Sequence, residues 1–144
     1  MPPEPQGRAV GTSDTTAEHA EYPLANPYAR TYTSHGFTVV EVHGEIDMST
    51  AGELAAHLDA ATAVPEPCVL VDLRQITFFD CSGLRVLCRA ESRAKEQGGS
   101  LRLVSDRPAM RRLLRAAGLL TRFPPLPELP LPGRPESGSA PPAP

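Results

Sequence analysis

The residues best suited to chemistry lie in the run Asp80-Cys81-Ser82-Gly83, which follows an apolar stretch and leads directly into a helical pattern. Small polar residues at such a junction meet the free backbone N–H groups of the helix N-terminus, where negative charge is favoured. Two interpretations of Ser82 follow: it caps the helix, or its hydroxyl is a nucleophile. Cys81 offers a thiol in the same surroundings, where thiolates are favoured.

The neighbouring residues argue against catalysis in this run. A nucleophilic serine needs a base and an orienting acid, and the pattern Gly-x-Ser-x-Gly is missing because residue 80 is Asp. A phosphatase loop of the Cys-x5-Arg kind would need Arg at residue 87, which is Leu, and Asp80 opposes a thiolate. Cys81 is therefore interpreted as a small, partly buried residue. A thiol- or serine-dependent enzyme is only a third hypothesis, and we expect no catalytic residue.

Other kinds of site find little support along the chain. The histidines His19, His35, His43 and His57 lack metal-ligand spacing, and His43 reads as a structural polar residue on a strand. Neither Gly-x-x-x-x-Gly-Lys-Ser/Thr nor Gly-x-Gly-x-x-Gly occurs. The arginines at 107, 111, 112 and 115 fit the solvated face of an amphipathic helix, without aromatic stacking residues beside them. We therefore expect no metal, no cofactor and no nucleic-acid partner.

The placement of proline bounds the domain. Of the 17 prolines, nine lie in residues 124–144 and five precede residue 30, so the window between them holds only Pro65, Pro67 and Pro108. This predicts a disordered N-terminal extension (residues 1–28), one domain (29–123) and a Pro-rich disordered tail (124–144). No apolar run is long enough to span a bilayer, and the N-terminus lacks the features of a signal peptide. We expect a cytoplasmic protein without a membrane partner.

Cysteine and charge complete this picture. Cys68, Cys81 and Cys88 fit neither a disulfide framework nor paired metal knuckles, which favours a reducing compartment. The net charge of -3 hides an uneven distribution: eight acidic residues and only Arg74 as a base lie in residues 37–84, whereas ten basic and three acidic residues lie in residues 85–122. Such a chain can present a dipolar surface that steers a charged partner.

The elements that position these residues follow from hydrophobic periodicity. Residues 29–33 and 37–43 form a predicted hairpin around Ser34-His35-Gly36, and residues 68–73 form a buried, central strand. Helices are expected over residues 51–63, 85–97 and 108–117, with a strand at 101–104. Ser49 or Thr50 with Glu53 resembles a capping box for the first helix, and Asp106 is the predicted cap of the last. The order β-β-α-β-α-β-α predicts an α/β fold with a mixed sheet of four to five strands and helices packed against it.

Three blocks of the sequence resemble the STAS domain of bacterial anti-sigma factor antagonists. They are Gly44-Glu-Ile-Asp-Met-Ser-Thr-Ala-Gly-Glu-Leu54, Asp72-Leu-Arg-Gln-Ile-Thr-Phe-Phe-Asp-Cys-Ser-Gly-Leu-Arg-Val-Leu87, and Gly99-Ser-Leu-Arg-Leu-Val-Ser105 with Leu114-Arg-Ala-Ala-Gly-Leu119. The resemblance covers about residues 29–123 in the expected order, and Asp-x-Ser-Gly-Leu is its most specific part. It implies a STAS fold and a binding switch in place of an enzyme.

The resemblance also implies partners and site residues. In that family the unphosphorylated antagonist binds an anti-sigma factor that is a serine kinase, which frees a sigma factor, and phosphorylation of the serine before Gly-Leu ends the association. That serine is Ser82 here, a PP2C-type phosphatase would reset it, and a monomer or weak dimer is expected. Cys81 stands where the family usually has a second serine. The implied partner-binding residues are Asp47, Ser49, Thr50, Asp80, Cys81, Ser82, Gly83 and Leu84.

One departure and one alternative accompany this prediction. The family commonly continues beyond Gly118-Leu119 with a short strand and a last helix, but the prolines after Phe123 forbid a regular helix. We therefore expect a shortened C-terminal cover of the sheet, or extended chain in its place. The alternative function, also in the binding class, is a STAS scaffold subunit of a larger signalling or lipid-transport complex.

Overall fold

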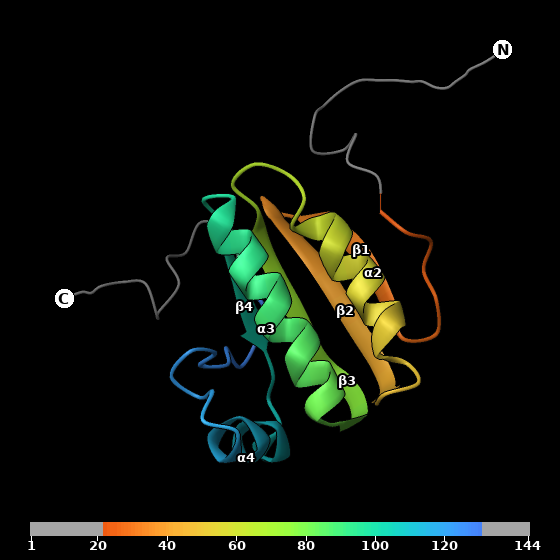
Figure 1. Ribbon diagram of the computed structural model, residues 1–144, viewed down its shortest axis with the longest axis vertical. Coiled ribbons are helices and arrows are strands. Elements are labelled where there is room, and N and C mark those ends of the chain that lie inside the picture. The colour runs from red at the N-terminus through yellow and green to blue at the C-terminus, as the bar shows by residue number, and fades with distance from the viewer. Residues whose placement is uncertain (1–21, 131–144) are drawn as a thin grey trace, which may run out of the picture.

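The computed structural model describes residues 22–130, and its centre is one four-stranded sheet (Figure 1). The strands are β1 (Ala29–Ser34), β2 (Phe37–Ile46), β3 (Cys68–Phe79) and β4 (Ser100–Val104), and they lie side by side in that order. The β1–β2 pair is antiparallel, whereas β2–β3 and β3–β4 are parallel. The predicted α/β fold with a mixed sheet is confirmed, with four strands.

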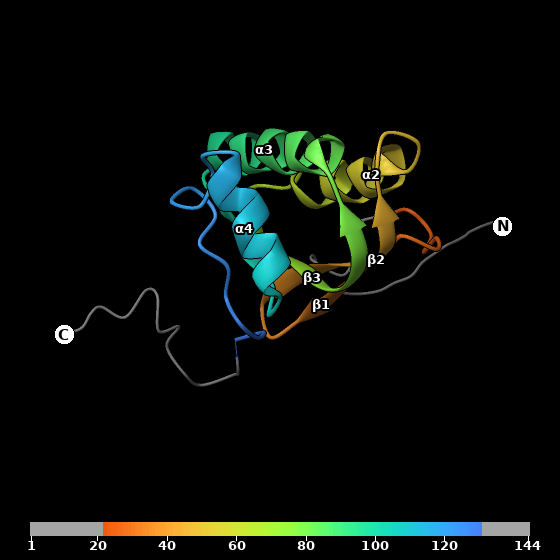
Figure 2. The ribbon, with the colours of Figure 1, turned by 90° about the horizontal axis from the view of Figure 1, so that it is seen from below.

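Three helices complete the described part of the chain. They are α2 (Ala51–Ala61), α3 (Cys81–Glu96) and α4 (Pro108–Ala116). Helices α2 and α3 cover one face of the sheet, and α4 lies beyond the end of β4, away from α2 (Figure 2). The crossovers through α2 and α3 are what a parallel β2–β3–β4 arrangement requires, because parallel neighbours cannot be joined by a tight turn.

The main core lies between the sheet and the helices α2 and α3. Alternate strand residues face it, among them Val40, Val42, Val69 and Val71, and each is at most 1% exposed. A second, smaller cluster lies on the opposite face, where Val39, Leu70 and Val104 are covered by partly buried side chains that include Leu126 and Leu129. The period of two along β2 and β3 therefore gives the sheet two apolar faces of very different size.

Local chemistry sets the turn and the helix ends. His35 and Gly36 both have positive φ (51° and 87°), as a two-residue turn between twisted antiparallel strands requires. Two predicted helix caps are wrong: no side-chain hydrogen bond caps α2 at Thr50, and Arg107 in place of Asp106 is the N-cap of α4. Helix α3 also begins earlier than predicted, at Cys81 in place of Arg85. Strand β3 is also longer than predicted, reaching Phe79 instead of Leu73.

The segments that flank the predicted domain contact it where the structure describes them. Leu24 accepts a hydrogen bond of 3.1 Å at its carbonyl from the buried His57, whose Nδ1 also lies 2.6 Å from Thr31 Oγ1. Leu126 forms a parallel bridge with Val104 at the β4 edge. Extended chain therefore takes the place of a regular last helix up to residue 130. The domain limits stay a prediction, and the tail residues 1–21 and 131–144 lie outside the described part.

Candidate functional site

Ser82 is the second residue of α3, and the structure corrects the interpretation that it caps the helix. Asp80 is the N-cap, and its Oδ1 accepts a hydrogen bond of 2.8 Å from the Ser82 backbone N–H. The Ser82 side chain is partly exposed, and within residues 22–130 its hydroxyl has no hydrogen-bond partner. A carboxylate therefore satisfies the helix end, which leaves the hydroxyl of Ser82 available to an incoming group.

The two residues after Ser82 fix the helix against the sheet. A Cβ at Gly83 would come within 2.5 Å of the Phe79 ring, so only glycine lets α3 approach the end of β3 this closely. Leu84 is 4% exposed and belongs to the main core. Both lie beneath the surface and hold Ser82 in place, and their predicted role in partner binding stays a prediction.

Cys81 lies on the surface at the first residue of α3. Its thiol is free and exposed, so the prediction of a small, partly buried residue is wrong. A helix residue that precedes Ser82 by one position points about 100° away from it, which leaves room for both side chains at the same helix end. Cys81 is therefore part of the exposed surface beside Ser82 and not part of the core.

Asp47 organises the loop that follows β2. Its Oδ1 accepts hydrogen bonds from the backbone N–H and the hydroxyl of Ser49 (2.9 and 2.8 Å) and from the Thr50 N–H (3.2 Å). These bonds, led by that of the Ser49 hydroxyl, lower the pKa of Asp47, so it is ionised at neutral pH. Thr50 Oγ1 in turn donates to the Glu45 carbonyl (2.8 Å) and accepts from the Asp47 N–H (2.9 Å). Asp47 thus accepts the backbone hydrogen bonds before α2, where a capping box of Ser49 or Thr50 with Glu53 was expected.

The parallel pairing of β2 and β3 brings the Asp47 loop and the Ser82 helix end together. Ile46 lies opposite Phe79, and the Asp80 N–H donates to the Ile46 carbonyl at 3.2 Å. The predicted Asp47, Ser49 and Thr50 therefore share one end of the sheet with Asp80, Cys81 and Ser82. We call this set of six residues the switch edge.

Two exposed apolar side chains at this end of the sheet escaped the sequence analysis. Met48, in the Asp47 loop, is 85% exposed, and Phe78, next to the end of β3, is 52% exposed. Met48 is flanked by polar residues, and Phe78 stands beside Phe79 at the end of a strand, so neither helical nor strand periodicity distinguishes them from core residues. The signal that could have found them is the position of a large apolar residue immediately beside a predicted site loop.

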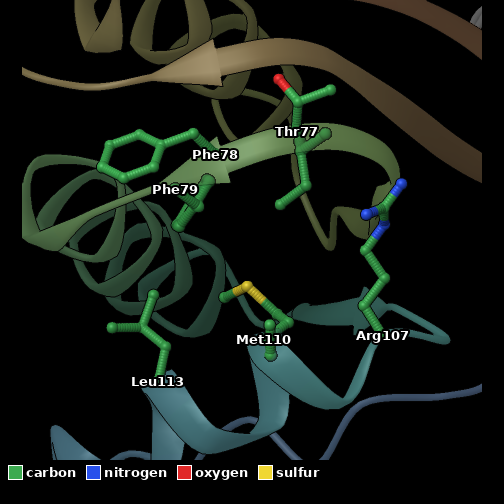
Figure 3. A pocket seen from close by; sticks show the side chains of 8 residues that line it. Thr77, Phe78, Phe79, Arg107, Met110 and Leu113 are labelled. Carbon is green, nitrogen blue, oxygen red and sulfur yellow. The ribbon is translucent and has the colours of Figure 1, made fainter.

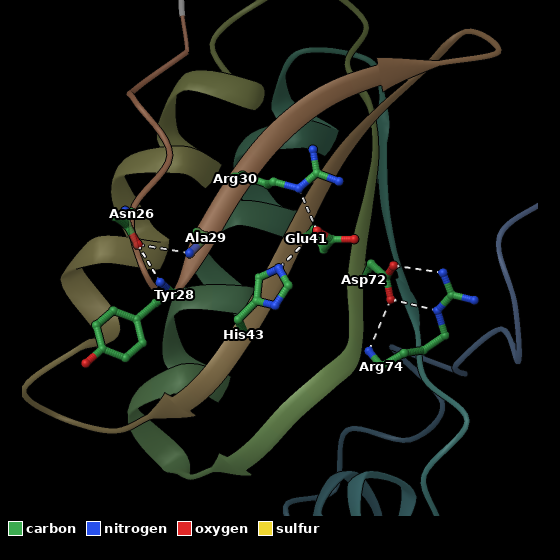
Figure 4. A network of polar contacts seen from close by, with 8 residues as sticks. All are labelled: Asn26, Tyr28, Ala29, Arg30, Glu41, His43, Asp72 and Arg74. Carbon is green, nitrogen blue, oxygen red and sulfur yellow. Dashed lines mark hydrogen bonds and ion pairs between the residues drawn. The ribbon is translucent and has the colours of Figure 1, made fainter.

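A network of charged residues lies on the sheet face that α2 and α3 leave uncovered (Figure 4). Arg30 and His43 both contact Glu41 Oε1, at 2.6 and 2.9 Å. Arg74 forms a bidentate salt bridge with the buried Asp72, and both of its hydrogen bonds measure 2.9 Å. Burial opposes ionisation of Glu41, but hydrogen bonds from Arg30 and His43 outweigh it and lower the pKa. Each carboxylate has a cation beside it, as in a structural network, and His43 has the structural role expected of it.

Among residues 22–130, no three His, Cys, Asp or Glu side chains are grouped so that they could hold a metal ion. In the same stretch, no helix has the length and apolar character needed to cross a membrane.

The sequence of this chain is similar to that of known proteins. The family model described as "Mlab, STAS domain" matches residues 31–127. The chain is 34% identical over 100 residues to the anti-sigma-F factor antagonist RsfA of Mycobacterium tuberculosis, an alignment that covers 67% of this chain and 77% of RsfA.

Solved structures show the same fold. An anti-sigma factor antagonist from Mycobacterium paratuberculosis superposes with a TM-score of 0.64 at 32% identity, covering 74% of this chain and 92% of that one. The Bacillus cell fate determinant SpoIIAA in its phosphorylated form gives a TM-score of 0.52 at 19% identity, with 66% and 87% coverage, and shares the fold. The chain therefore belongs to the STAS-domain family of anti-sigma factor antagonists, which are regulators without enzymatic activity.

Proposed function

We propose that this protein binds an anti-sigma factor with serine kinase activity, which releases a sigma factor, until phosphorylation of Ser82 ends the association. The observation that carries the proposal is the unpartnered, partly exposed hydroxyl of Ser82 in the first turn of a capped helix, within residues 22–130. A kinase can reach such a hydroxyl without unfolding the helix. The similarity to a named anti-sigma-F factor antagonist supports the choice of partner.

The unphosphorylated switch edge offers a partner both apolar contact and hydrogen bonds. Cys81 is exposed, Ser49 is an exposed residue with a hydroxyl, and Met48, which adjoins Ser49 in the chain, is 85% exposed beside this edge. Interfaces of this kind combine a few desolvated apolar side chains with a polar rim. Gly83 and Leu84 contribute to partner binding indirectly, because their packing against the sheet holds α3 in the position that leaves Ser82 partly exposed.

Phosphorylation of Ser82 is compatible with the fold of the monomer. A phosphate adds about -1.5 to -2 charges at neutral pH. It would stand at the positive end of the α3 dipole, which favours an anion there and offsets part of the repulsion from Asp80. The helix therefore keeps its first turn, and the modification acts through the surface of the protein.

The same phosphate is unfavourable once a partner covers it. The loop that carries Asp47 lies at the same end of the sheet, the pKa of Asp47 is lowered by its hydrogen bonds, and the side chain of Asp80 lies in the same helix turn as Ser82. Like charges brought together at a desolvated interface cost several kcal/mol, and about 1.4 kcal/mol changes the affinity tenfold. A single modification thus separates a bound from an unbound state. We further propose that a PP2C-type phosphatase resets Ser82 and that the exchange takes place in the cytoplasm.

The test uses the purified full chain, its cognate anti-sigma factor and ATP. We expect incorporation of one phosphate in the wild type and none in Ser82→Ala, while the control Ser92→Ala, an exposed serine farther along the same helix, is modified normally. Ser82→Asp should bind the anti-sigma factor at least tenfold more weakly than wild type. Equal phosphorylation of Ser82→Ala would contradict the proposal. Stable co-purification with a large assembly whatever residue stands at 82 would favour the scaffold alternative.

A further inference from the structure

A small apolar pocket lies between the end of β3 and helix α4 (Figure 3). Its volume is about 130 Å³. The residues that line it and matter for the argument are Ile76, Phe79, Arg107, Ala109, Met110 and Leu113. Thr77 and Arg107 are the polar residues of its wall and the other lining residues are apolar, and Figure 3 shows Met110 and Leu113 rising from α4 toward the end of β3. None of the interactions described for the switch edge uses this space.

The size of the pocket selects the kind of group that fits. Sites for metabolites and cofactors commonly measure about 300–1,000 Å³. A cavity of about 150 Å³ lined by aliphatic and aromatic side chains accommodates one benzene ring. The pocket therefore suits one apolar side chain of the size of leucine or phenylalanine, which points to a protein partner over a free metabolite.

The mouth of the pocket is positively charged. Arg107 is the N-cap of α4, and the first turn of that helix contains no acidic residue, so a cation and the positive end of the helix dipole lie together. The guanidinium of Arg107 donates from Nε to the Arg74 carbonyl at 3.4 Å, and residues 22–130 provide it no carboxylate partner. The pKa of Arg74 is raised chiefly by its hydrogen bond to Asp72, and the charge of Asp106 adds a smaller contribution. An incoming carboxylate would complement the charge that Arg107 leaves uncompensated.

The charge extends along α4. Arg111, Arg112 and Arg115 are exposed, and none of them forms an ion pair within the described part of the chain. A long polyanion is disfavoured, because Asp47 and Asp80 stand at the end of β2 and β3 and the chain carries a net charge of -3. A short acidic segment of a protein fits this surface better than nucleic acid.

The pocket and the switch edge share a wall. Phe79 lines the pocket, and its ring is the group against which Gly83 packs, one residue after Ser82. A partner that covers Ser82 therefore lies within reach of the pocket without crossing another element of the sheet. The two surfaces can act as one extended interface, with Ser82 and acidic residues at one end and an apolar pocket with Arg107 at the other.

We propose that this pocket is a second contact for the anti-sigma factor and receives an apolar side chain of that partner next to one of its carboxylates. The proposal rests on the function proposed above. The apolar side chain fills the space between Phe79 and Met110, and the carboxylate binds Arg107. Because Ser82 itself does not line the pocket, this contact contributes affinity that phosphorylation does not alter directly.

The first experiment measures the affinity of the anti-sigma factor for four variants by calorimetry. Ala109→Trp obstructs the pocket from an exposed position, and Arg107→Glu reverses the charge at its mouth. We expect each to weaken binding about tenfold or more, as loss of an interface anchor does. The control Arg112→Glu makes the same charge change on the same helix away from the pocket and should alter binding by less than about threefold. Ser82→Asp reports on the switch alone.

The second experiment needs no partner protein. The full chain, labelled with 15N, is titrated with millimolar N-acetyl-leucine, which carries an apolar side chain and a carboxylate, and in parallel with N-acetyl-leucinamide, which lacks the charge. We expect the amide signals of Ala109, Met110 and Thr77 to shift with the acid, and to shift less with the amide. Ala109→Trp should abolish these shifts.

The outcomes separate this proposal from the proposed function. Wild-type affinity in both Ala109→Trp and Arg107→Glu, with weak binding by Ser82→Asp, would overturn the pocket contact and leave the switch intact.

If the anti-sigma factor does not bind the wild type, the proposed function fails, and the titration then decides whether the pocket is a binding site. Shifts that depend on the carboxylate support the pocket contact, and equal or absent shifts overturn it. Equal losses in Arg107→Glu and Arg112→Glu would indicate general charge attraction, as for nucleic acid, and would also overturn it. A change in self-association confined to the pocket variants would assign the pocket to a second copy of this chain.

Discussion

The Asp80 carboxylate accepts a hydrogen bond of 2.8 Å from the backbone N–H of Ser82, so the cap of α3 and the proposed phosphorylation site are two residues apart. The capped amide belongs to the same residue that carries the free hydroxyl. Substituting the cap therefore tests how firmly Ser82 is positioned.

Asp80→Ala is expected to lower the free energy of unfolding by about 0.5–2 kcal/mol, because the first turn of α3 loses its side-chain acceptor. Asp80→Asn keeps an acceptor and should lose less. Urea denaturation of the three proteins, followed by circular dichroism, measures the difference. An unchanged midpoint in Asp80→Ala would show that the cap does not stabilise α3.

Gly83→Ala is expected to destabilise the protein by about 1–3 kcal/mol, because the added Cβ overlaps the Phe79 ring and the core cannot easily yield. Gly52→Ala is the matched control: a Cβ there meets no atom within 4 Å, and alanine suits the helix. It should gain about 0.5–1 kcal/mol. Thermal unfolding distinguishes them, and equal effects at both positions would contradict the close packing of α3 on β3.

Ser82→Asp should weaken partner binding without unfolding the protein. A negative charge in the first turn interacts favourably with the helix dipole, by about 0.3–1 kcal/mol, and Asp80 opposes part of this. The melting temperature should therefore remain close to that of the wild type, as calorimetry of the isolated protein can show. A large drop in stability would mean that the substitution acts by disrupting the fold, and the binding result would lose its meaning as a switch.

Much of the fold could be predicted from the sequence because hydrophobic periodicity records it directly. The order of strands and helices is confirmed, and the apolar run that begins at Cys68 is indeed central. The end of β3 was underestimated, since residues beyond Leu73 alternate between buried Ile76 and exposed neighbours such as Phe78, and a strand that leaves the core loses its continuous apolar signal.

The site was predicted in outline, and its hydrogen bonds were not. Residue types suggest that Ser82 or Thr50 caps a helix, but the choice among neighbouring polar side chains depends on backbone geometry. Asp80 and Asp47 accept the bonds because each carboxylate follows a parallel strand and turns back on the amides after it. Propensity alone does not distinguish such residues from a cap one or two positions later.

The acid sensitivity of the fold should depend on Glu91. Burial opposes its ionisation, but hydrogen bonds from Arg122 (2.7 Å) and Lys95 (3.1 Å) outweigh burial and lower its pKa. A carboxyl whose pKa is lower in the folded state stabilises fully at neutral pH and loses this contribution as the pH falls through the folded pKa.

Glu91→Gln should therefore lose about 1–3 kcal/mol at neutral pH and approach the wild type in acid. The free energy of unfolding, measured in urea across a pH series, gives the comparison. Glu96→Gln serves as control, since Glu96 is exposed on the same helix. A difference between Glu91→Gln and wild type that stays constant down to strongly acidic pH would show that the carboxylate does not act through its charge.

The chain after Phe123 should protect the edge of β4. Leu126 accepts a hydrogen bond of 2.8 Å from the Ser105 N–H and donates one of 2.9 Å to the Leu103 carbonyl. Leu126→Ala weakens the apolar anchor of this segment, so the free energy of unfolding should fall by about 1 kcal/mol and the Ser105 amide should exchange faster with solvent. Leu24→Ala, at a side chain 91% exposed, should change neither. Unchanged exchange at Ser105 in Leu126→Ala would contradict the pairing.

The parallel alignment of β2 and β3 has a consequence for how recognition can diversify. The loops after Ile46 and Phe79 are far apart in the chain but leave the sheet at one end, and each is secured mainly by its own local hydrogen bonds. Their exposed residues can therefore vary one loop at a time while the buried strands stay the same. Two paralogues in one cell could in this way exchange short segments and acquire separate partners, keeping their signals insulated from each other on a common scaffold.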